Sequence, residues 1–411
     1  MQNKLSGYIA LLLLFSFCVK SQTIQEKSIK KNITFLASDK LKGRGTSSPE
    51  ELVSANYIAE KFKTLGLTSF NNSYLKAFSY KKNLNPHDTS IVNIAEKKAN
   101  NVVGFIDNKA PYTIVIGAHY DHLGLGHDKN SLDANPENKI HNGADDNASG
   151  TAGVIELANY FSKNNTIEPF NFLFICFSGE ELGLLGSKKY CENPDIELIK
   201  INYMINMDMI GRLNDSTKKL LIYGVGTSPS WVPLIDSLKT DFSIKKDSSG
   251  IGPSDQTSFY LKDIPVLFFF TGTHSDYHKP SDHEEKINYY GVNAIVNYVA
   301  RIANEISNQE QLPFTKTKAN AAKTRPKYKV TLGIMPDYTD HGDGLHVDGV
   351  TEGRPADVAG IKEGDIITKI GTCEIKEVYA YMECLGKLNV GDVLPVTFKR
   401  NGETKTVSVK F

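Results

Sequence analysis

Four short runs of almost uninterrupted apolar residues constrain the fold of this chain more than any other feature. The segments between them include helical periodicity, with apolar residues at Val154, Leu157, Ala158 and Phe161. A strand that is apolar at nearly every position, rather than at every second one, is typical of a sheet covered on both faces. The pattern therefore predicts an α/β domain with a mixed, mostly parallel central sheet flanked by helices. The four runs are Tyr112–Ala118, Phe170–Phe177, Tyr203–Met207 and Pro265–Phe270.

Helical spacing also marks the segment before the first run. Apolar residues between about 26 and 67 recur every three or four positions, and Gly66 provides a stop. The segment Lys42-Gly43-Arg44-Gly45 interrupts this pattern and separates two expected helices. Residues 213–262 are less regular, and this part of the domain could hold a lid.

The first residues read as an export signal. Lys4 precedes an apolar run from Tyr8 to Phe17, and small enough residues at positions 19 and 21 allow cleavage before Gln22. We therefore expect a signal peptide at 1–21 and a periplasmic, cell-surface or secreted protein. A lipid anchor at Cys18 is the weaker alternative, because Phe17 is bulky where such signals favour a small residue. No other uncharged stretch approaches the roughly 20 residues of a transmembrane helix.

Composition divides the remainder into two domains joined by a linker. Residues 22–307 carry the predicted sheet, residues 308–327 are polar and lack apolar periodicity, and residues 328–411 contain a separate set of short β-like runs. Lys+Arg and Asp+Glu are equal at 47 each, which argues against nucleic acid or an anionic membrane as a partner. None of the four cysteines outside the signal peptide has metal-type spacing, and we expect mostly free thiols.

Each of the four apolar runs is followed at once by side chains that can hold a cation. In a parallel sheet these strand ends lie at the same edge, so their loops should converge in one crevice. A further acid, Asp146, lies in the small-residue segment Gly143–Gly150 and could bridge two ions. The residues that follow the runs are His119 and Asp121, then Glu180 and Glu181, then Asp208, and lastly His278.

Taken singly, these residues have ordinary structural explanations. A histidine at a strand end is more often hydrogen-bonded than metal-bound, paired acids often begin a helix, and the Asp145-Asp146-Asn147 triplet suits a turn. Their arrangement at the ends of successive strands favours a metal site. Two histidines with several carboxylates suit zinc, and two ions about 3.5–4 Å apart would act together on water and a carbonyl. Glu180 and Glu181 point in different directions, so one should bind metal and the other act as general base.

At these positions the sequence resembles the di-zinc exopeptidase family that includes secreted leucine aminopeptidases, aminopeptidase S and glutamate carboxypeptidase. The resemblance spans roughly residues 26 to 306. It rests on five ordered motifs: His119-x-Asp121, Asp146-x-x-Ser149-Gly150, Gly179-Glu180-Glu181-x-Gly183-x-x-Gly186-Ser187, Asn206-Met207-Asp208-Met209-Ile210-Gly211 and Tyr277-His278-x-Pro280-x-Asp282.

The resemblance implies a role for each residue. Asp146 would bridge two Zn²⁺ ions and be followed by a cis peptide bond to Asn147. His119 and Asp208 would complete one zinc site, and Glu181 and His278 the other. Glu180 becomes the base, Asp121 orients His119 from behind, and Tyr277 donates to the developing oxyanion. His274 is the rival of His278, but only His278 fits the spacing to Pro280 and Asp282.

The expected activity is hydrolysis of peptide bonds by a zinc-bound hydroxide, with an aminopeptidase favoured. A carboxypeptidase would need arginines for the substrate carboxylate, and Arg212 is the one such residue near a motif. A carboxypeptidase and a glutaminyl cyclase remain alternatives on the same scaffold, although cyclases usually keep a single zinc. A peptide-binding protein with an inactive peptidase domain is the alternative from another class.

Residues 328–411 resemble a PDZ domain of the bacterial protease type. The segment 332–335 looks like its carboxylate-binding loop, and 353–367 looks like its signature strand-helix segment. The resemblance implies that a peptide C-terminus is bound as an added strand. A β-domain that only stabilises or dimerises the enzyme is the alternative.

Overall fold

The computed structural model describes residues 24–81, 95–127, 130–306, 310–317, 330–336, 343–350, 353–376 and 378–411. The expected signal peptide and Cys18 lie outside these residues. Within the described residues, no helix is long and apolar enough to cross a lipid bilayer.

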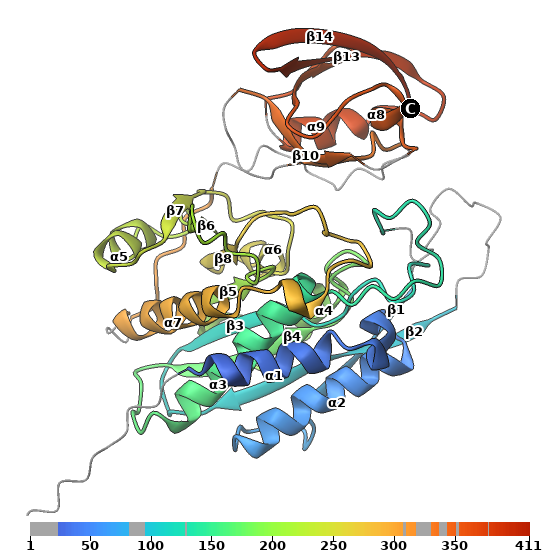
Figure 1. Cartoon of the computed structure of the whole chain (residues 1–411). Coiled ribbons are helices and arrows are strands. Elements are labelled where there is room, and N and C mark those ends of the chain that lie inside the picture. Colours follow the sequence, from blue (N-terminus) through green and yellow to red (C-terminus); the bar gives the residue numbers. More distant parts are fainter. Residues whose placement is uncertain are drawn as a thin grey trace, which may run out of the picture.

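The first domain is built on an eight-stranded sheet with the order β1-β2-β4-β3-β5-β8-β6-β7 (Figure 1). Its four inner strands β4, β3, β5 and β8 are neighbours and run parallel to one another. They correspond to the four apolar runs, which confirms the predicted mixed, mainly parallel sheet. The strands are β1 Leu75–Tyr80, β2 Lys97–Ile106, β3 Thr113–His119, β4 Asn171–Phe177, β5 Ile201–Met207, β6 Lys219–Tyr223, β7 Ser243–Lys246 and β8 Val266–Phe270.

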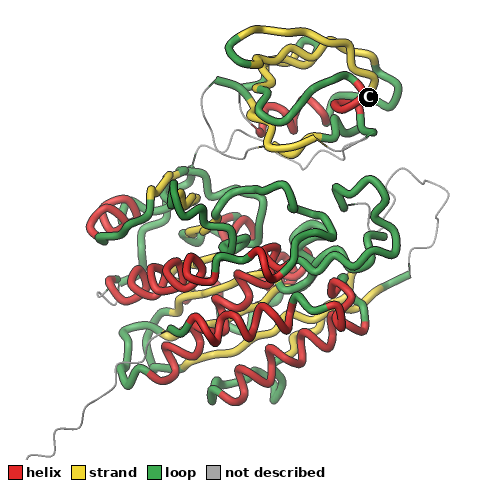
Figure 2. The backbone as a smooth tube through the Cα atoms, viewed as in Figure 1, coloured by secondary structure: helices red, strands yellow, loops and turns green. Residues whose placement is uncertain are grey.

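Helices cover this sheet on both faces, as Figure 2 shows. Alternate residues of β3 separate the two faces: Ile114 and Ile116 pack in the core that includes residues of α1, α2, α3 and α7, whereas Val115 packs in the core that includes residues of α4 and α6. Burial on both faces explains why the strand residues are apolar throughout. The helices of this domain are α1 Glu26–Leu36, α2 Pro49–Thr64, α3 Gly150–Lys163, α4 Leu185–Glu192, α5 Trp231–Ser237, α6 Gln256–Tyr260 and α7 Tyr289–Glu305.

The two predicted N-terminal helices are α1 and α2, and local sequence explains where α2 begins. Ser48 caps it by accepting a hydrogen bond from the Glu51 amide at 3.0 Å, and Pro49 occupies the first helical turn. The irregular segment 213–262 contains two outer strands and two helices, and Trp231 within it is fully buried.

Part of the expected linker lies against the first domain. Leu312 is buried in the larger core, and its amide donates to Asn202 Oδ1 at 2.7 Å. Phe314 packs against Tyr260 with ring centroids 5.6 Å apart. Residues 310–317 therefore extend the surface that the first domain buries.

The C-terminal domain is a smaller β-rich unit with its own apolar core. The sheet follows the order β14-β13-β11-β10-β9, with β12 paired to β11, so β9 is an outer strand. Its elements are β9 Ile334–Pro336, β10 Leu345–Val350, α8 Pro355–Val358, β11 Ile366–Ile370, β12 Cys373–Glu374, α9 Val378–Leu385, β13 Val393–Arg400 and β14 Glu403–Lys410.

The expectation of mostly free thiols is wrong for the C-terminal domain. Cys373 on β12 and Cys384 on α9 form a disulfide, with their Cα atoms 6.0 Å apart. The fold brings these two elements together, and nothing in the eleven-residue spacing indicates it. Cys176 and Cys191 are free and buried, as expected for small core residues.

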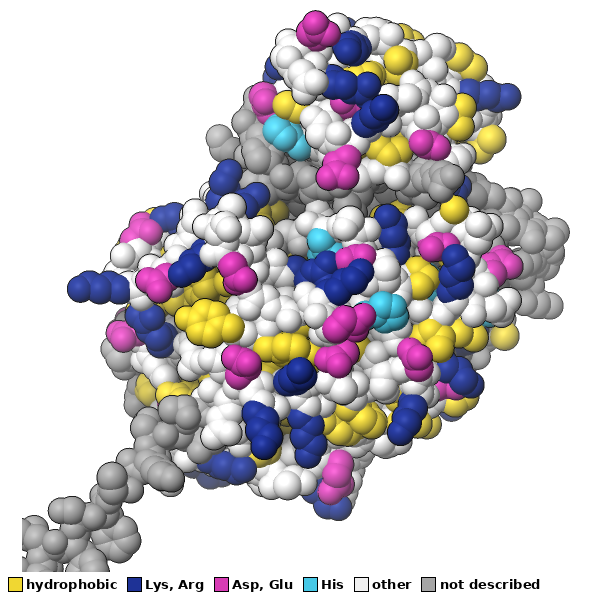
Figure 3. All heavy atoms as spheres, in the orientation of Figure 1, with side chains coloured by type: hydrophobic (Ala, Val, Ile, Leu, Met, Phe, Trp, Pro, Cys, Tyr) yellow, Lys and Arg dark blue, Asp and Glu magenta, His cyan; other side chains and the backbone are white. Residues whose placement is uncertain are grey.

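The outer surface carries both signs of charge. On the face drawn in Figure 3, Lys and Arg side chains are interspersed with Asp and Glu side chains. This mixture agrees with the balanced composition and offers no broad basic surface on that face for a polyanion.

Candidate metal centre

The carboxyl ends of the parallel strands bring the predicted ligands together. His119 ends β3, Asp208 follows β5, and Glu181 follows β4 after a short turn. Ligand atoms of His119, Asp146 and Glu181 all lie within 4.8 Å of one another. His278 reaches the same place from the loop after β8, so one edge of the sheet supplies the whole group.

We call the five predicted ligands the cage: His119, Asp146, Glu181, Asp208 and His278. One half of the cage is formed around His119. Its Nε2 lies 3.3 Å from Asp146 Oδ1 and 3.2 Å from Asp208 Oδ1. The other ring nitrogen, Nδ1, lies 3.1 Å from the Asp121 carbonyl oxygen, a hydrogen-bond acceptor. Nδ1 must therefore carry the proton in the neutral ring, which leaves a lone pair on Nε2 facing two carboxylate oxygens.

The other half repeats this arrangement around His278. Its Nε2 lies 3.2 Å from both Asp146 Oδ2 and Glu181 Oε2. Its Nδ1 lies 2.9 Å from the Asn130 carbonyl oxygen, which again fixes the proton on Nδ1. The two oxygens of Asp146 thus belong to different halves, as the prediction that Asp146 bridges two ions would require.

Lone pairs that face one another at these distances require a cation between them. Zinc bonds of about 2.0–2.2 Å in tetrahedral geometry separate the ligand atoms by about 3.3–3.6 Å, close to the observed spacings. Within the protein, His119 Nε2 and Asp208 Oδ1 are buried and have no hydrogen-bond partner. The residues present therefore fit a divalent metal centre.

The pKa values of the cage residues also indicate a site that favours positive charge. Burial lowers the pKa of His119 and of His278, but the surrounding carboxylates outweigh burial and raise both pKa values well above the ordinary value. For Asp146, burial raises the pKa, while His122, His119 and His278 together bring it well below the ordinary value. The carboxylates of the cage therefore favour positive charge at both histidines.

Hydrogen bonds to a more distant acid, Asp282, hold the backbone of Asp146. Asp282 Oδ2 accepts from the amides of Asp145 at 2.9 Å and Asp146 at 3.1 Å. The peptide bond between Asp146 and Asn147 is cis, as the family resemblance implied. The Asn147 side chain donates to the Met207 carbonyl at 3.0 Å, and so ties this loop to the end of β5.

Asp121 lies behind both His119 and Glu180. Its Oδ1 is 3.7 Å from His119 Nδ1, farther than its own carbonyl oxygen, and accepts from the Glu180 amide at 3.1 Å. Its Oδ2 accepts from Thr46 Oγ1 at 2.7 Å. Asp121 therefore fixes the turn that carries the predicted base as well as the metal-binding histidine.

Glu180 interacts electrostatically with the same group of charges. Burial raises its pKa well above the ordinary value, His119 opposes the shift, and Glu181, Asp255 and Asp208 add to it. In contrast, burial raises the pKa of Glu181, but the nearby histidines His278 and His122 outweigh burial and lower this pKa to about 2. The two neighbouring glutamates therefore differ as a base and a ligand should.

Two residues near the cage were missed by sequence reasoning. His122 Nδ1 lies 2.7 Å from Glu181 Oε1, on the side away from the oxygen that faces His278. Asp255, just before α6, is fully buried, and burial raises its pKa to about 7. His122 follows Asp121 in the same loop and could have been found; Asp255 lies in the irregular segment, where no motif marks it.

Three residues considered in the sequence analysis lie outside the ligand set: His274, Arg212 and Tyr277. His274 Nε2 lies 3.1 Å from Asp145 Oδ2, so the rival histidine pairs with a residue outside the ligand set. Arg212 pairs with Asp276 at 2.6 Å. The Tyr277 ring stacks on His278 with centroids 3.9 Å apart, which places the predicted oxyanion donor beside a ligand.

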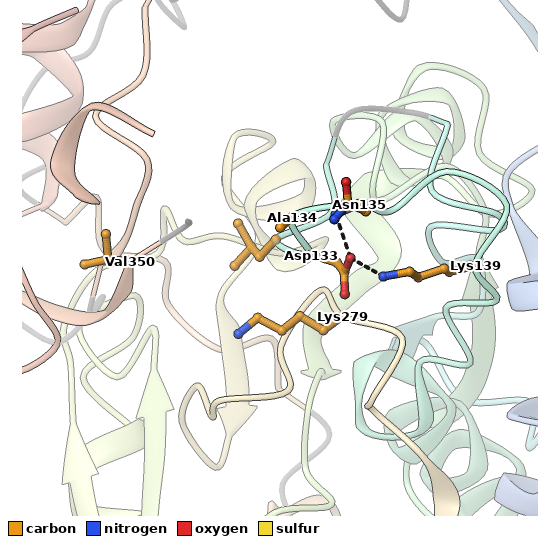
Figure 4. Close-up of a pocket in the computed structure, with 7 residues that line it drawn as sticks. Asp133, Ala134, Asn135, Lys139, Lys279 and Val350 are labelled. Carbon is orange, nitrogen blue, oxygen red and sulfur yellow. Dashed lines mark hydrogen bonds and ion pairs between the residues drawn. The ribbon is translucent and has the colours of Figure 1, made fainter. Parts of the chain in front are cut away.

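A hollow of about 390 Å³ lies near the His278 loop (Figure 4). Leu132 forms part of its wall, and its amide donates to the His278 carbonyl at 2.9 Å. Asp133 in the wall is paired with Lys139 at 2.6 Å, and the Lys279 side chain extends into the hollow. Val350 of the C-terminal domain lies on the opposite side.

In the C-terminal domain, the predicted carboxylate-binding loop leads directly into the outer strand β9. Leu332 is fully buried, and its carbonyl accepts from the Ala356 amide at 2.8 Å. Gly333 has φ +77°, and a Cβ there would lie 2.2 Å from Arg354 Cβ, so the turn requires glycine. This places a glycine turn next to β9, which is an outer strand of the sheet among the described residues, and a peptide that binds by strand addition uses such a strand.

Comparisons with known proteins agree with the predicted class of each of the two domains. Residues 101–303 match the sequence model of peptidase family M28, and residues 330–411 match that of the PDZ domain. The chain is 27% identical to aminopeptidase YwaD of Bacillus subtilis over 259 residues, which cover 61% of this chain and 50% of that protein. The chain spans about half the length of the curated relatives it matches first.

Solved structures share the fold at low sequence identity. The LapA aminopeptidase of Legionella pneumophila is 22% identical with a TM-score of 0.53, covering 69% of this chain and 72% of that chain. A glutaminyl cyclase of Porphyromonas gingivalis is 15% identical with a TM-score of 0.55, covering 69% of this chain and 99% of that chain. At these identities the likeness establishes the fold and leaves the reaction open.

Proposed function

Since residues 101–303 belong to peptidase family M28 and residues 330–411 form a PDZ domain, we propose that the protein is an exported zinc aminopeptidase. It would hydrolyse peptide bonds at the N-terminal end of peptide substrates. Export rests on the signal-like sequence at 1–21. The alkaline phosphatase isozyme conversion protein and the aminopeptidase among the relatives match only in part, so the activity rests mainly on the site.

The observation that carries the proposal is the pair of ligand groups that share Asp146. His119 and Asp208 face one of its oxygens, and His278 and Glu181 face the other. Two Zn²⁺ ions bound there would polarise the substrate carbonyl and lower the pKa of a water molecule.

Glu180 is the residue that moves the proton. Its carboxylate accepts a proton from the attacking water and then passes it to the amine that leaves when the peptide bond breaks. Burial favours the protonated form of Glu180, so the carboxylate is a stronger base than an exposed glutamate. Asp121 holds the Glu180 amide at 3.1 Å and keeps the base directed at the site.

The charge around the cage favours a substrate with a free ammonium group. Asp121, Asp146, Asp208 and Asp255 are all buried there, and the Glu181 side chain is 4% exposed. Arg212, the candidate for binding a substrate carboxylate, is already paired with Asp276. An N-terminal amine suits this surrounding better than a C-terminal carboxylate does.

A carboxypeptidase is the second candidate because of Lys279. This residue follows the ligand His278, and its side chain extends into the hollow of Figure 4, where it could receive a carboxylate. A glutaminyl cyclase is the third, because one of the structures with this fold is such an enzyme. The complete set of five ligands favours two ions over the single zinc that cyclases usually keep.

A panel of peptides separates these activities. Each peptide is supplied with a free or acetylated N-terminus and a free or amidated C-terminus, together with a peptide that begins with glutamine. We expect acetylation of the N-terminus to abolish cleavage and amidation of the C-terminus to leave it nearly unchanged. The opposite pattern would identify a carboxypeptidase, and release of ammonia from the N-terminal glutamine would identify a cyclase.

The substitution Glu180→Gln tests the mechanism in the same assay. Because general-base catalysis contributes roughly 10²–10⁴-fold, we expect kcat to fall by at least 100-fold while bound zinc stays at two ions per chain. Glu192→Gln, at an exposed glutamate paired with Lys189 on α4, is the matched control. Full activity in Glu180→Gln would exclude this residue as the base.

The PDZ domain would bind the C-terminus of a partner or substrate peptide. The turn at Leu332 and Gly333 and the open edge of β9 support this assignment. Isothermal titration with peptides of free and amidated C-termini tests it, since only the free carboxylate should bind. Equal binding of both forms would favour the alternative, a domain that stabilises or dimerises the enzyme.

A further inference from the structure

Arg44 is fully buried, and none of its five hydrogen bonds goes to a carboxylate. It belongs to the Lys42–Gly45 segment that interrupts the N-terminal helical pattern and lies outside every motif of the metal cage. A buried arginine is costly unless its donors are satisfied. The burial of Arg44 therefore indicates a specific structural role for its side chain.

All five N–H donors of the guanidinium point at backbone carbonyl oxygens. These carbonyls come from three separate segments: the end of α1, the loop after β3 that carries His119 and Asp121, and the loop that leads to Asp146. The bonds run from Nε to Tyr120 at 2.7 Å, from Nη1 to Leu36 at 2.8 Å and to Asn142, and from Nη2 to Gly143 at 2.7 Å and Asp146 at 3.5 Å.

The backbone around Arg44 is built to bring the side chain into this position. Gly43 has φ +71°, and a Cβ there would lie 2.4 Å from the His141 carbonyl oxygen. The Gly43 and Arg44 carbonyls accept from the amides of Gly124 at 3.0 Å and His122 at 3.2 Å. The segment is therefore hydrogen-bonded to the loop after β3 and lies against the chain at His141, just before the loop that leads to Asp146.

The guanidinium also places a permanent positive charge behind the cage. Burial lowers the pKa of Arg44 to about 10, while Asp146, Asp121, Asp282 and Glu181 oppose this shift. Arg44 therefore carries a positive charge that attracts the nearby carboxylates, in addition to its hydrogen bonds to the backbone.

We propose that Arg44 is a positioning residue that holds the His119 loop and the Asp146 loop at ligand spacing before zinc binds. The inference rests on the proposed metal centre and extends it by naming the group that sets its zinc affinity. Asp146 serves both halves of the cage, so a shift of its loop weakens both sites together. Lysine cannot replace this role, because its ammonium has three donors and no planar fork.

The substitution Arg44→Lys tests the proposal in the full chain. We expect zinc affinity, measured by competition with a chromogenic chelator, to fall by roughly 10–100-fold at both sites, the usual effect of losing a group that orients ligands. The cobalt-loaded variant should also show altered visible absorption bands, because those bands report ligand geometry.

Asn171→Ala is the matched control. Asn171 makes two hydrogen bonds to the backbone of Ala110 at the start of β4, at the opposite end of the strand from the cage. This variant should lose stability and keep its zinc affinity within about threefold. An Arg44→Lys protein with wild-type zinc affinity and cobalt spectrum would overturn the proposal.

Hydrogen exchange provides a second measurement that does not depend on the variant being folded or on zinc being the natural metal. In the metal-free wild-type protein, the amides of residues 120–122 and 142–147 should stay protected, because Arg44 holds these loops without metal. Rapid exchange there that is suppressed only by zinc would show that the metal, rather than Arg44, orders the loops. If zinc does not bind at all while the loops stay protected, the proposed function fails and the positioning role stands.

Discussion

The first domain and the C-terminal domain both bury carboxylates, but the buried carboxylates differ in their hydrogen-bond partners. In the C-terminal domain, Asp365 is fully buried and accepts two hydrogen bonds of 2.6 Å from Arg400 and one of 2.8 Å from the Lys362 amide. In the first domain, buried atoms of Asp208, Asp255 and His119 have no hydrogen-bond partner within the protein.

This difference separates a structural ion pair from a site prepared for a ligand. A buried polar group without a partner destabilises a fold, so several of them at one place call for an explanation. Among the described residues, such atoms occur in the first domain both away from the cage, as at Tyr203 on β5, and at the cage, where His119 Nε2 and Asp208 Oδ1 lie 3.2 Å apart. The C-terminal domain offers a strand edge instead, and binding there leaves its core fully paired.

The largest effect is expected from removing the ligand shared by the two halves of the cage. Asp146→Asn should lose both zinc ions and at least about 10³-fold in activity, because metal stabilisation of the transition state is worth several kcal/mol. His278→Ala should lose one ion and retain the other. Metal analysis after dialysis provides the measurement, and a single lost ion in Asp146→Asn would contradict a bridging role.

The second effect concerns the C-terminal domain alone. The Cys373–Cys384 disulfide closes a loop of eleven residues, which should stabilise that domain by about 3 kcal/mol through the entropy of the unfolded chain. The double variant Cys373→Ser/Cys384→Ser should lower the C-terminal transition in calorimetry and leave zinc content and kcat unchanged. A fall in zinc content would show that the two domains are coupled more closely than their separate cores indicate.

The smallest effect is a change in pH dependence within the first domain. Burial raises the pKa of Glu51 to about 8, from an ordinary value of 4.5. Between these values the folded state keeps a proton that the unfolded state has lost, so the free energy of unfolding falls as pH rises, by about 1.4 kcal/mol per pH unit.

Glu51→Gln should remove this contribution to the slope and leave that of Asp255, whose pKa burial raises to about 7. Urea titrations of wild type and variant at pH 5, 6 and 7 provide the measurement, with the C-terminal transition as an internal control. If both proteins lose the same stability across this range, Glu51 does not hold the proton. Glu50→Gln, at the neighbouring glutamate paired with Lys42, is the matched control.

The fold was predictable where the sequence pattern is local. Four continuous apolar runs became the four parallel inner strands because burial on both faces selects apolar residues at each position. The disulfide was not predictable, since it depends on where β12 and α9 meet. The course of residues 310–317 was also not predictable, because the contacts of Leu312 and Phe314 lie far away in the sequence.

The candidate site also has a part that local sequence patterns predict and a part that depends on tertiary contacts. The five predicted ligands and Glu180 could be proposed from the sequence because each lies in a motif of fixed spacing, and all but Asp146 end or follow an apolar strand. His122, Asp255 and Arg44 were missed as parts of the site, because they act through contacts with segments that are distant in sequence or lack a motif. Their importance can be seen only as distances between atoms.

The sequence by itself therefore determined the class of fold, the division into two domains and which side chains gather at the sheet edge, because strand periodicity and strand-end position are local properties. Only the tertiary structure decided how the two oxygens of Asp146 divide between the histidines, which ring nitrogen faces the cage, and what holds the loops at that spacing. Those features depend on interactions that are strong over a few ångströms and join residues up to about 150 positions apart.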